Sequence, residues 1–475
     1  MFRGQVHFTV NGQFHDLSGE GAFAPLSDTL RYRLRKTGTK VVCAEGDCGA
    51  CTVLLARVGD SGVLDFQSIN SCIFPSFSAD GCHLVTVEGL ASGEVLHEIQ
   101  KSMARNFGGQ CGFCTPGFVM SLVNMFERKA KPSEQNIKNY LTGNLCRCTG
   151  YQPILQAAQD VDMQNVKPVR EMYPLQVETE QLRAKTTSSL MIEAGARTLF
   201  APRTLAEAVK FRGENPKARI FSGATDIGVQ INKGKYPGDK QMSLHLLVGL
   251  NRLELDSGFV HVGARVTLDR LQNFCQTHAP AFAEFLNIFA SPQIKNSATL
   301  AGNLANGSPI ADTTPFLLAV DAQIELTGSK GTRLVPLNGF FVGYKKFNKS
   351  EEEFITAVRF ITPKTSRLKI GLYKVSQRRD LDISCVNSCF IVHEQDGKIA
   401  SAKIAFGGVG PVAVRLFELE NKITGQTLDR ALVDAVAAEI GQTVQPISDV
   451  RGSGVFRKRM AQQLFKKFAR EHLGL

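Results

Sequence analysis

Nine of the twelve cysteines in this 475-residue chain lie between Cys43 and Cys148, in less than a quarter of its length. In a reducing compartment, spaced cysteines are more often metal ligands or catalytic thiols than disulfide partners. The opening sequence, MFRGQVHFTVNG, alternates like a strand and lacks the apolar core of a signal peptide. No apolar run approaches the roughly 20 residues that cross a bilayer. We therefore predict a cytoplasmic chain, not a membrane protein, whose N-terminal third binds metal.

The first group of cysteines has the spacing of a plant-type 2Fe–2S cluster, Cys-x4-Cys-x2-Cys with a fourth cysteine after a further 20 residues. The intervening sequence, CAEGDCGAC, contains Gly46 and Gly49, which allow the backbone to turn sharply around two irons. Inward-pointing N–H groups can offset the negative charge of the cluster. Zinc is the alternative, but it usually uses two separated pairs of ligands. The expected iron ligands are Cys43, Cys48, Cys51 and Cys72.

A second group combines a Cys-x2-Cys pair with a Cys-x-Cys pair, each in a glycine-containing turn followed by a helical pattern. Nearby helix N-termini stabilise thiolate charge. This group alone favours an iron–sulfur cluster and leaves zinc open. Its members are Cys111, Cys114, Cys146 and Cys148. The four remaining cysteines have apolar or unremarkable surroundings and are expected to be ordinary core residues; they are Cys82, Cys275, Cys385 and Cys389.

The periodicity of the N-terminal part predicts two small domains. Residues 5–17 alternate around Asn11–Gly12, a strong hairpin signal, and Ser27 or Asp28 is a candidate cap for a helix with Leu30 inward. We predict an α+β domain over 1–90 and a four-helix domain over 91–160, with its first helix starting near Val95. Residues 161–192 are polar and aperiodic, which favours a linker.

Two α+β domains are expected beyond the linker, over 193–365 and 366–475. No Gly-x-Gly-x-x-Gly follows a strand, so a Rossmann dinucleotide site lacks support. Two loops of small and polar residues, FSGATDIG and NSATLAGNLANGSPIADTTP, could instead bring backbone N–H groups close to a pyrophosphate. Taken alone, each loop is more simply interpreted as a turn.

The segments CAEGDCGAC, QCGFCTPG and LCRCTGYQP, in this order, resemble the iron–sulfur part of the xanthine dehydrogenase/aldehyde oxidase family of molybdenum hydroxylases. The resemblance implies a ferredoxin-like β-grasp domain and a helical domain, each holding one 2Fe–2S cluster through the eight cysteines above. It places Gln110 beside the pterin of a molybdenum cofactor. The two small-residue loops resemble the FAD domain of the same family, so the likeness spans nearly the whole chain.

The family pattern implies an FAD site. The first loop would wrap the adenine and diphosphate end, and Lys374 could stabilise negative charge on reduced flavin. Tyr344 matches an aromatic near the face where nicotinamide docks, and a half-buried structural role is as consistent with its sequence. For Phe289 and Ile355, core packing is the simpler interpretation. The implied FAD contacts are Ile220, Phe221, Ser222, Gly223, Ala224, Thr225, Asp226, Ile227, Phe289, Thr299, Gly302, Asn303, Asp312, Ile355 and Lys374.

The chain has no room for a molybdopterin-binding region, and is thus similar to the small iron–sulfur/FAD subunit of two-subunit bacterial enzymes of the xanthine dehydrogenase type. The resemblance implies an electron relay from a large molybdenum subunit through two clusters to FAD and then NAD+ or oxygen. It also implies a heterotetramer of two small and two large subunits. The alternatives are a subunit acting on aldehydes or other N-heterocycles and, remotely, a zinc-dependent nucleic-acid-binding protein. The net charge of +11 is spread along the chain, which fits FAD phosphates or a partner surface better than nucleic acid.

Overall fold

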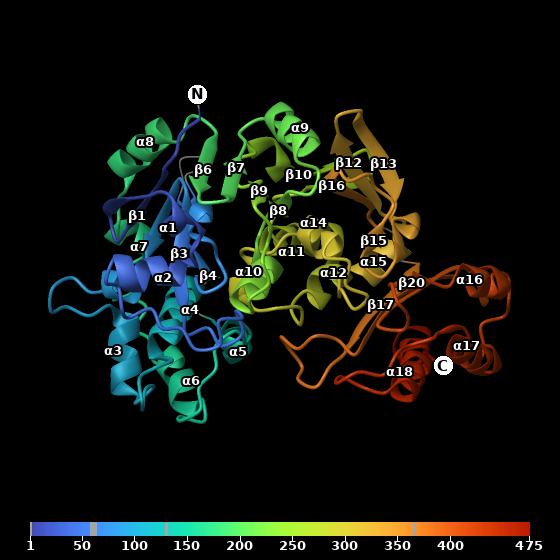
Figure 1. The fold of residues 1–475 in the computed structure, drawn as a ribbon. Helices are drawn as coiled ribbons and strands as arrows, with labels where there is room; N and C mark the ends of the chain where they lie inside the picture. The colour runs from blue at the N-terminus through green and yellow to red at the C-terminus, as the bar shows by residue number, and fades with distance from the viewer. Residues whose placement is uncertain (1, 58–63, 129–131, 364–366) are drawn as a thin grey trace. The chain divides into compact units, whose positions relative to one another are not determined.

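The fold is described from a computed structural model, which covers residues 2–57, 64–128, 132–363 and 367–475 (Figure 1). The chain divides into two compact units. One comprises Met1–Val248 with Ala290–Ala298, and the other comprises Gly249–Phe289 with Thr299–Leu475. The predicted boundary between 365 and 366 falls outside the described residues, and the predicted domain limits stay predictions. The multidomain α+β class is confirmed.

The first unit opens with a mixed five-stranded sheet in the order β2-β1-β5-β3-β4. Its only parallel pairing joins β1 to β5 among the described strands, an arrangement of the β-grasp type. Apolar side chains of this sheet pack against Leu26 and Leu30, which are fully buried. The strands are β1 (Val6–Val10), β2 (Gln13–Leu17), β3 (Thr52–Arg57), β4 (Gln67–Asn70) and β5 (Cys82–Val85).

The predicted hairpin is confirmed: β1 and β2 pair antiparallel around Asn11 and Gly12, whose φ angles are 51° and 80°. The predicted cap at Ser27 or Asp28 is wrong. Helical structure begins at Leu26, in α2 (Leu26–Asp28), and continues as a π-helical turn over Thr29–Arg33. The Leu26 N–H is bonded to the carbonyl of Phe74 at 2.8 Å, so a tertiary contact fixes this helix start.

Four helices follow, as predicted: α3 (Glu98–Arg105), α4 (Thr115–Arg128), α5 (Glu134–Leu141) and α6 (Gln152–Gln159). Ser133 caps α5 through its hydroxyl, which accepts from Asn136 N at 3.3 Å. The predicted start of the first helix near Val95 is too early, because α3 begins at Glu98 and Val95 is 64 % exposed. His97 caps α3 by accepting from Ile99 N at 3.2 Å.

The segment over 161–192, predicted to be a linker, is a structured connection. It contains α7 (Val169–Met172), α8 (Gln176–Lys185) and the start of a second sheet. Val169, Leu175 and Leu182 are buried. The second sheet has the order β6-β7-β9-β8. Its elements are β6 (Leu190–Ala194), β7 (Arg197–Ala201), β8 (Arg219–Phe221) and β9 (Lys240–Ser243), with helices α9 (Leu205–Glu214) and α10 (Thr225–Asn232) between its strands.

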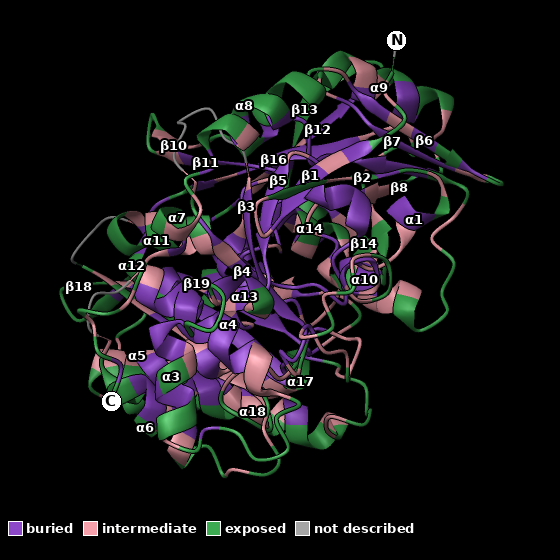
Figure 2. Cartoon of the chain, turned by 90° about the vertical axis from the view of Figure 1, so that its left-hand side faces the viewer, coloured by how far each residue is buried: buried purple, intermediate pink, exposed green. Residues whose placement is uncertain are grey.

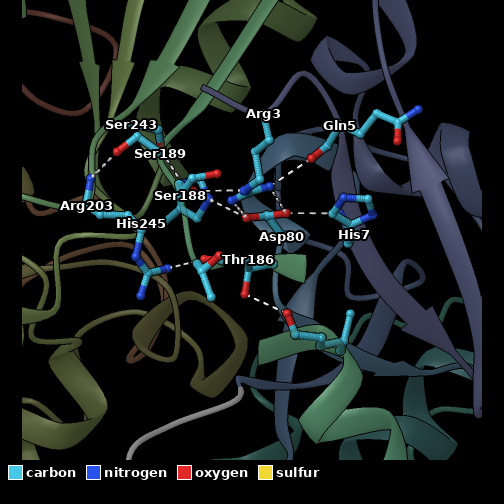
Figure 3. A network of polar contacts seen from close by, with 12 residues as sticks. Arg3, Gln5, His7, Asp80, Thr186, Ser188, Ser189, Arg203, Ser243 and His245 are labelled. Carbon is cyan, nitrogen blue, oxygen red and sulfur yellow. Dashed lines mark hydrogen bonds and ion pairs between the residues drawn. The ribbon is translucent and has the colours of Figure 1, made fainter. Parts of the chain in front are cut away.

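A buried ion pair fastens the two sheets of the first unit (Figure 3). Asp80, whose side chain is fully buried, accepts from Arg3 Nη1 at 2.8 Å and from His7 N at 2.9 Å. A second contact joins Arg3 Nη2 to the other carboxylate oxygen. Arg3 also donates from Nε to Ser188 O at 2.9 Å, just before β6. The N-terminal residues therefore tie the first sheet to the edge of the second.

The second unit contains a five-stranded antiparallel sheet in the order β10-β11-β16-β12-β13 and a four-stranded one in the order β17-β18-β19-β20. A long hairpin in the C-terminal part of the chain consists of β18 and β19 and turns at Asp396–Gly397. The strands are β10 (Leu253–Asp256), β11 (Phe259–Gly263), β12 (Gln323–Gly328), β13 (Gly331–Pro336), β14 (Phe341–Gly343), β15 (Lys346–Phe347), β16 (Phe354–Ile361), β17 (Leu368–Val375), β18 (Val386–Gln395), β19 (Lys398–Gly407) and β20 (Val414–Arg415).

The central strands of the sheets are buried, and the outward faces of several flanking helices are exposed (Figure 2). The C-terminal helices pack Phe465 and Phe468 against Phe390 of β18. None of the described helices has the length and apolarity that crossing a bilayer requires. The helices of this unit are α11 (Leu268–His278), α12 (Pro280–Phe285), α14 (Leu300–Ala305), α15 (Thr314–Ala319), α16 (Phe417–Ile423), α17 (Arg430–Thr443) and α18 (Gly454–Phe468).

Candidate cofactor-binding sites

The first cysteine group converges in three dimensions. The Cys43 thiol hydrogen-bonds to those of Cys48 and Cys72, and the Cys51 thiol hydrogen-bonds to that of Cys72. The contact with Cys48 lowers the pKa of Cys43 and raises that of Cys48, because one thiol donates and the other accepts. Glu45 N also donates to Cys43 Sγ at 3.4 Å. This matches the expectation that backbone N–H groups offset thiolate charge.

The backbone of this loop has the sharp turns that the sequence predicts. Gly46 and Gly49 have φ angles of 78° and 67°, in the left-handed region where a side chain is disfavoured. Between them they reverse the chain, so that Cys43, Cys48 and Cys51 reach the same place. Cys51 and Cys72 are buried, whereas Cys43 and Cys48 are partly exposed.

The second cysteine group forms two contacting pairs, Cys111 with Cys148 and Cys114 with Cys146. Burial, followed by the contact with Cys146, raises the pKa of Cys114 to about 12. Thr149 Oγ1 donates to Cys146 Sγ at 3.0 Å. Helix α4 begins immediately after Cys114, so its positive N-terminal end lies beside the thiols.

Both groups bring four thiols into contact, as the two irons of a 2Fe–2S cluster require, since each iron takes two thiolates. The second group divides into two contacting pairs. In the first group, Cys43 contacts both Cys48 and Cys72, and Cys51 contacts Cys72. A structural zinc ion needs four ligands around one point. Within the described part of the chain, no group of three or more His, Cys, Asp or Glu is placed to hold a metal ion.

The two cysteine loops contact one another directly. Leu145 N donates to Cys48 O at 3.0 Å, and the neighbouring Asn144 donates from Nδ2 to Gly49 O at 3.3 Å. This hydrogen bond therefore joins the backbone of Cys48, in the first group, to Leu145, the residue directly before Cys146 of the second group. The sequence gives no sign of this link.

The four cysteines outside the two groups are core residues, as predicted. All four are buried, and burial raises the pKa of Cys275 to about 12. Cys82 begins β5 and lies in the same core cluster as Phe8. Arg57 Nη1 donates to its sulfur at 3.3 Å. A buried thiol of this kind behaves as a small apolar side chain.

The loop predicted to bind the FAD diphosphate joins β8 to α10. Ala224 has a left-handed φ of 59° and stands just before α10, so the chain turns abruptly from strand to helix. A Cβ on Gly223 would lie 1.9 Å from Ser297 O, so the loop rests on the segment that leads to Thr299. The N–H groups at the start of an eight-residue helix suit a phosphate. Phe221 ends β8, and its fully buried side chain packs on Phe77. Its side chain therefore belongs to the core.

Helix α10 is also bonded to the first cysteine loop. Asn232 Nδ2 donates to Ala44 O and to Cys72 O, both at 2.8 Å. Lys233 lies 3.1 Å from Glu45. The C-terminal end of the helix that follows the candidate phosphate loop thus contacts three residues in or beside the first cysteine group, Ala44, Glu45 and Cys72. The Asn232 contacts were not anticipated from the sequence.

A separate cluster in the second unit surrounds Asp312. Lys374 Nζ lies 2.8 Å from Asp312 Oδ2, with both side chains at most 5 % exposed. Asn387 Nδ2 donates to Asp312 Oδ1 at 2.6 Å, and Ser384 Oγ donates to the same oxygen. The Lys374 charge is therefore already paired, which the sequence did not indicate. Buried, fully bonded carboxylates of this kind fix the orientation of their neighbours.

The other predicted FAD residues have varied surroundings. Thr299 caps α14 by accepting from Gly302 N at 3.0 Å, and Asn303 accepts from Thr313 Oγ1 at 2.6 Å. Ile355 is buried within β16, consistent with core packing. Tyr344 is 60 % exposed, between β14 and β15. The remaining FAD candidates, Ile220, Ser222, Thr225, Ile227 and Phe289, are half-buried, and Asp226 is exposed. Gln110, predicted to lie beside the pterin of the molybdenum cofactor, is exposed.

Three family models match the chain. The description "2Fe-2S binding domain" applies to residues 86–159, and "FAD binding domain in molybdopterin dehydrogenase" applies to residues 192–363. The "CO dehydrogenase flavoprotein C-terminal domain" matches residues 371–472. These models follow the domain order that the sequence predicts.

Curated relatives include xanthine dehydrogenase 1 of Arabidopsis thaliana, 29% identical over 97% of this chain and 39% of that protein. Xanthine dehydrogenase of Emericella nidulans is 30% identical over 98% of this chain and 38% of that protein. The chain thus spans about two-fifths of their length. It belongs to the molybdenum hydroxylase family of oxidoreductases and carries that family's 2Fe–2S and FAD-binding domains.

Solved structures support the fold. Carbon monoxide dehydrogenase from Hydrogenophaga pseudoflava aligns with a TM-score of 0.55 at 23% identity, covering 58% of this chain and 96% of that one. Quinoline 2-oxidoreductase from Pseudomonas putida 86 aligns with a TM-score of 0.53 at 22% identity, covering 58% and 95% respectively. At this identity the likeness concerns the fold alone.

Proposed function

We propose that this chain is the electron-transfer subunit of a xanthine dehydrogenase, relaying electrons from a partner molybdenum site through two 2Fe–2S clusters to FAD and then to NAD+. The observation that carries the proposal is an unbroken series of contacts in the first unit. The second cysteine group is linked to the first by Leu145 N donating to Cys48 O. The first is linked to α10, and so to the phosphate loop, by Asn232 donating to Cys72 O.

Each part of the relay has protein groups suited to it. When bound, the clusters carry single electrons and FAD joins them to two-electron chemistry. The chain supplies four thiolates for each cluster, with N–H groups that offset the charge of Cys43. For FAD we propose the loop over Ile220–Ile227 of the first unit. In the second unit, Thr299, Gly302, Asn303, Asp312 and Lys374 stay predicted FAD contacts. We assign no acid, base or nucleophile to this chain, because substrate oxidation belongs to the partner.

The surface around the second cysteine group favours a protein partner. Cys111 and Cys148 are exposed, and apolar side chains surround them in sequence: Phe107 is 80 %, Phe113 48 % and Leu145 40 % exposed. Exposed apolar residues gathered near a redox site are typical of an interaction surface. We propose that the molybdenum-cofactor subunit covers this surface, with Gln110 facing its pterin, in a cytoplasmic heterotetramer of two small and two large chains.

Purification from the native host tests the relay. Two 2Fe–2S clusters and one FAD predict four irons per chain, two distinct electron paramagnetic resonance signals and a flavin spectrum. A molybdenum-containing partner should co-purify, and xanthine and hypoxanthine should reduce NAD+. Stoichiometric zinc with no visible absorbance would overturn the proposal.

A second candidate is the equivalent subunit of a molybdenum hydroxylase acting on an aldehyde or another N-heterocycle. It is motivated by a neighbour in fold, quinoline 2-oxidoreductase, whose name gives a different N-heterocycle. Substrate contacts are expected on the partner, so the same preparation separates the candidates. A molybdenum partner that turns over aldehydes or quinolines and leaves xanthine untouched would support the second candidate. Oxygen consumption without NAD+ reduction would change the assigned acceptor alone.

A further inference from the structure

Gln293 belongs to a short helix, α13 (Pro292–Lys295), that inserts into the first unit from far along the chain. Its side chain is 1 % exposed. Its Nε2 lies 2.9 Å from Asn144 Oδ1, 3.0 Å from Ser121 Oγ and 3.4 Å from Thr52 Oγ1. These acceptors come from the strand that follows the first cysteine loop, from helix α4, and from the turn before Cys146. One buried amide therefore joins three elements that are distant in sequence.

The three partners stand at the link between the cysteine loops. Asn144 directly precedes Leu145, the residue that donates to Cys48 O. Asn144 also donates to Gly49 O, which accepts from Thr52 Oγ1 at 2.6 Å as well. Ser121 Oγ donates to Asn144 Oδ1 at 2.7 Å. Gln293 and Ser121 therefore both donate to the side-chain oxygen of Asn144. The Asn144 amide group donates in turn to the carbonyl of Gly49, the residue after Cys48.

We propose that Gln293 is a positioning residue that sets the contact between the two cysteine loops, and through it the rate of electron transfer between their clusters. The inference rests on the proposed relay. Without the amide donors, the Asn144 carbonyl oxygen loses a partner in a buried site, and the Asn144–Leu145 turn is less firmly held against Cys48.

Asn296 offers a matched control on the same segment. It is also a buried amide, 6 % exposed, and its Nδ2 donates to Ser68 O at 2.8 Å. Ser68 lies on β4, and among the described residues the Asn296 side chain bonds to Ser68 and not to Asn144 or Leu145. Both residues carry a side-chain oxygen with no partner among the described residues. The near-isosteric changes Gln293→Met and Asn296→Leu therefore each remove buried amide donors, and they differ in what those donors hold.

The experiment compares the two variants with the native chain, all loaded with their cofactors. Amide hydrogen exchange of the peptide containing Leu145 reports how often its bond to Cys48 opens. In Gln293→Met this exchange should be about tenfold faster, equivalent to ~1.4 kcal/mol and within the cost of removing one partner of a buried hydrogen bond. After laser-flash reduction, the electron paramagnetic resonance signals of the two clusters should show that the electron redistributes between them more slowly. Both signals should keep their full intensity.

Asn296→Leu should lower the melting temperature about as much as Gln293→Met does. It should leave both the exchange of the Leu145 amide and the electron redistribution between the clusters unchanged. If Gln293→Met fails to fold, Ser121→Ala removes one support of Asn144 and should give a smaller change of the same sign. Native-like exchange and redistribution in Gln293→Met, or equal changes in both variants, would overturn the positioning role. Absence of two cluster signals in the native chain would instead refute the relay on which it rests.

Discussion

Replacing Gly223 with alanine perturbs the candidate phosphate loop at one defined point. The added Cβ would lie 1.9 Å from Ser297 O, 2.7 Å from Ser297 C and 2.9 Å from Ala298 Cα. Ordinary contact begins near 3.4 Å, so the loop and the segment before Thr299 must separate by about 1.5 Å. All the obstructing atoms are backbone, which cannot rotate away. Overpacking of this kind costs about 1–3 kcal/mol, and the displaced N–H groups should hold a pyrophosphate less well.

The assay is the molar ratio of FAD to iron after gel filtration, together with the dissociation constant of FAD from flavin fluorescence. We expect at least a tenfold weaker FAD affinity for Gly223→Ala, equivalent to about 1.4 kcal/mol, with iron content unchanged. The control is Gly213→Ala in α9, where a Cβ meets nothing within 4 Å and alanine should stabilise the helix by about 0.5–1 kcal/mol. Native FAD affinity in Gly223→Ala would refute the assignment of the loop.

Three further predictions, which use four substitutions, test other parts of the molecule. Arg3→Leu removes the guanidinium that pairs with the fully buried Asp80 carboxylate, which keeps the His7 N–H and has the His245 ring 4.0 Å away. Urea unfolding should show a loss of about 3–5 kcal/mol in the free energy of unfolding. A loss below about 1 kcal/mol would contradict the role of this ion pair in joining the two sheets. Cys148→Ser should remove one cluster signal and Cys43→Ser the other, and the loss of neither would disprove the ligand assignment. Burial lowers the pKa of the His83 ring from 6.5 to about 4 in the folded chain. As pH falls from about 6.5 to 4, the unfolded chain therefore takes up a proton that the folded chain does not, and the free energy of unfolding should fall. His83→Gln should flatten this part of the stability profile, and an unchanged slope would show that other groups produce it.

Local chemistry explains which parts of the fold were predictable. The turn at Asn11–Gly12 requires two positive φ angles, which that dipeptide adopts readily, and the structure has them. Ser133 and Thr204 each stand directly before a helix, and each caps it by accepting a hydrogen bond from the backbone N–H three residues further on. The cysteine groups were readable because an iron–sulfur cluster imposes its spacing on neighbouring residues of one loop.

Features fixed by distant contacts were not predictable. The helix at Leu26 starts where Phe74 O accepts its N–H, so the nearby Ser27 and Asp28 gave a false cap signal. Residues 161–192 lack a clear period, yet Leu182 is fully buried, because two short helices bury single residues rather than a stripe. Gln293 and Asn232 are ordinary amides in sequence, and their partners lie 149 and 160 residues away.

The two cysteine groups differ in exposure in the order that the proposed relay requires. Cys111 and Cys148 are exposed, whereas Cys51 and Cys72 are buried. The backbone carbonyl of Cys72 also accepts a hydrogen bond from Asn232 of α10. A partner can approach the second group, but protein covers these two members of the first. Since solvent exposure and hydrogen bonds to sulfur set cluster potentials, the two clusters should be reduced at separate potentials. Covering Cys111 and Cys148 with the partner should then shift the potential of the second cluster and leave that of the first nearly unchanged.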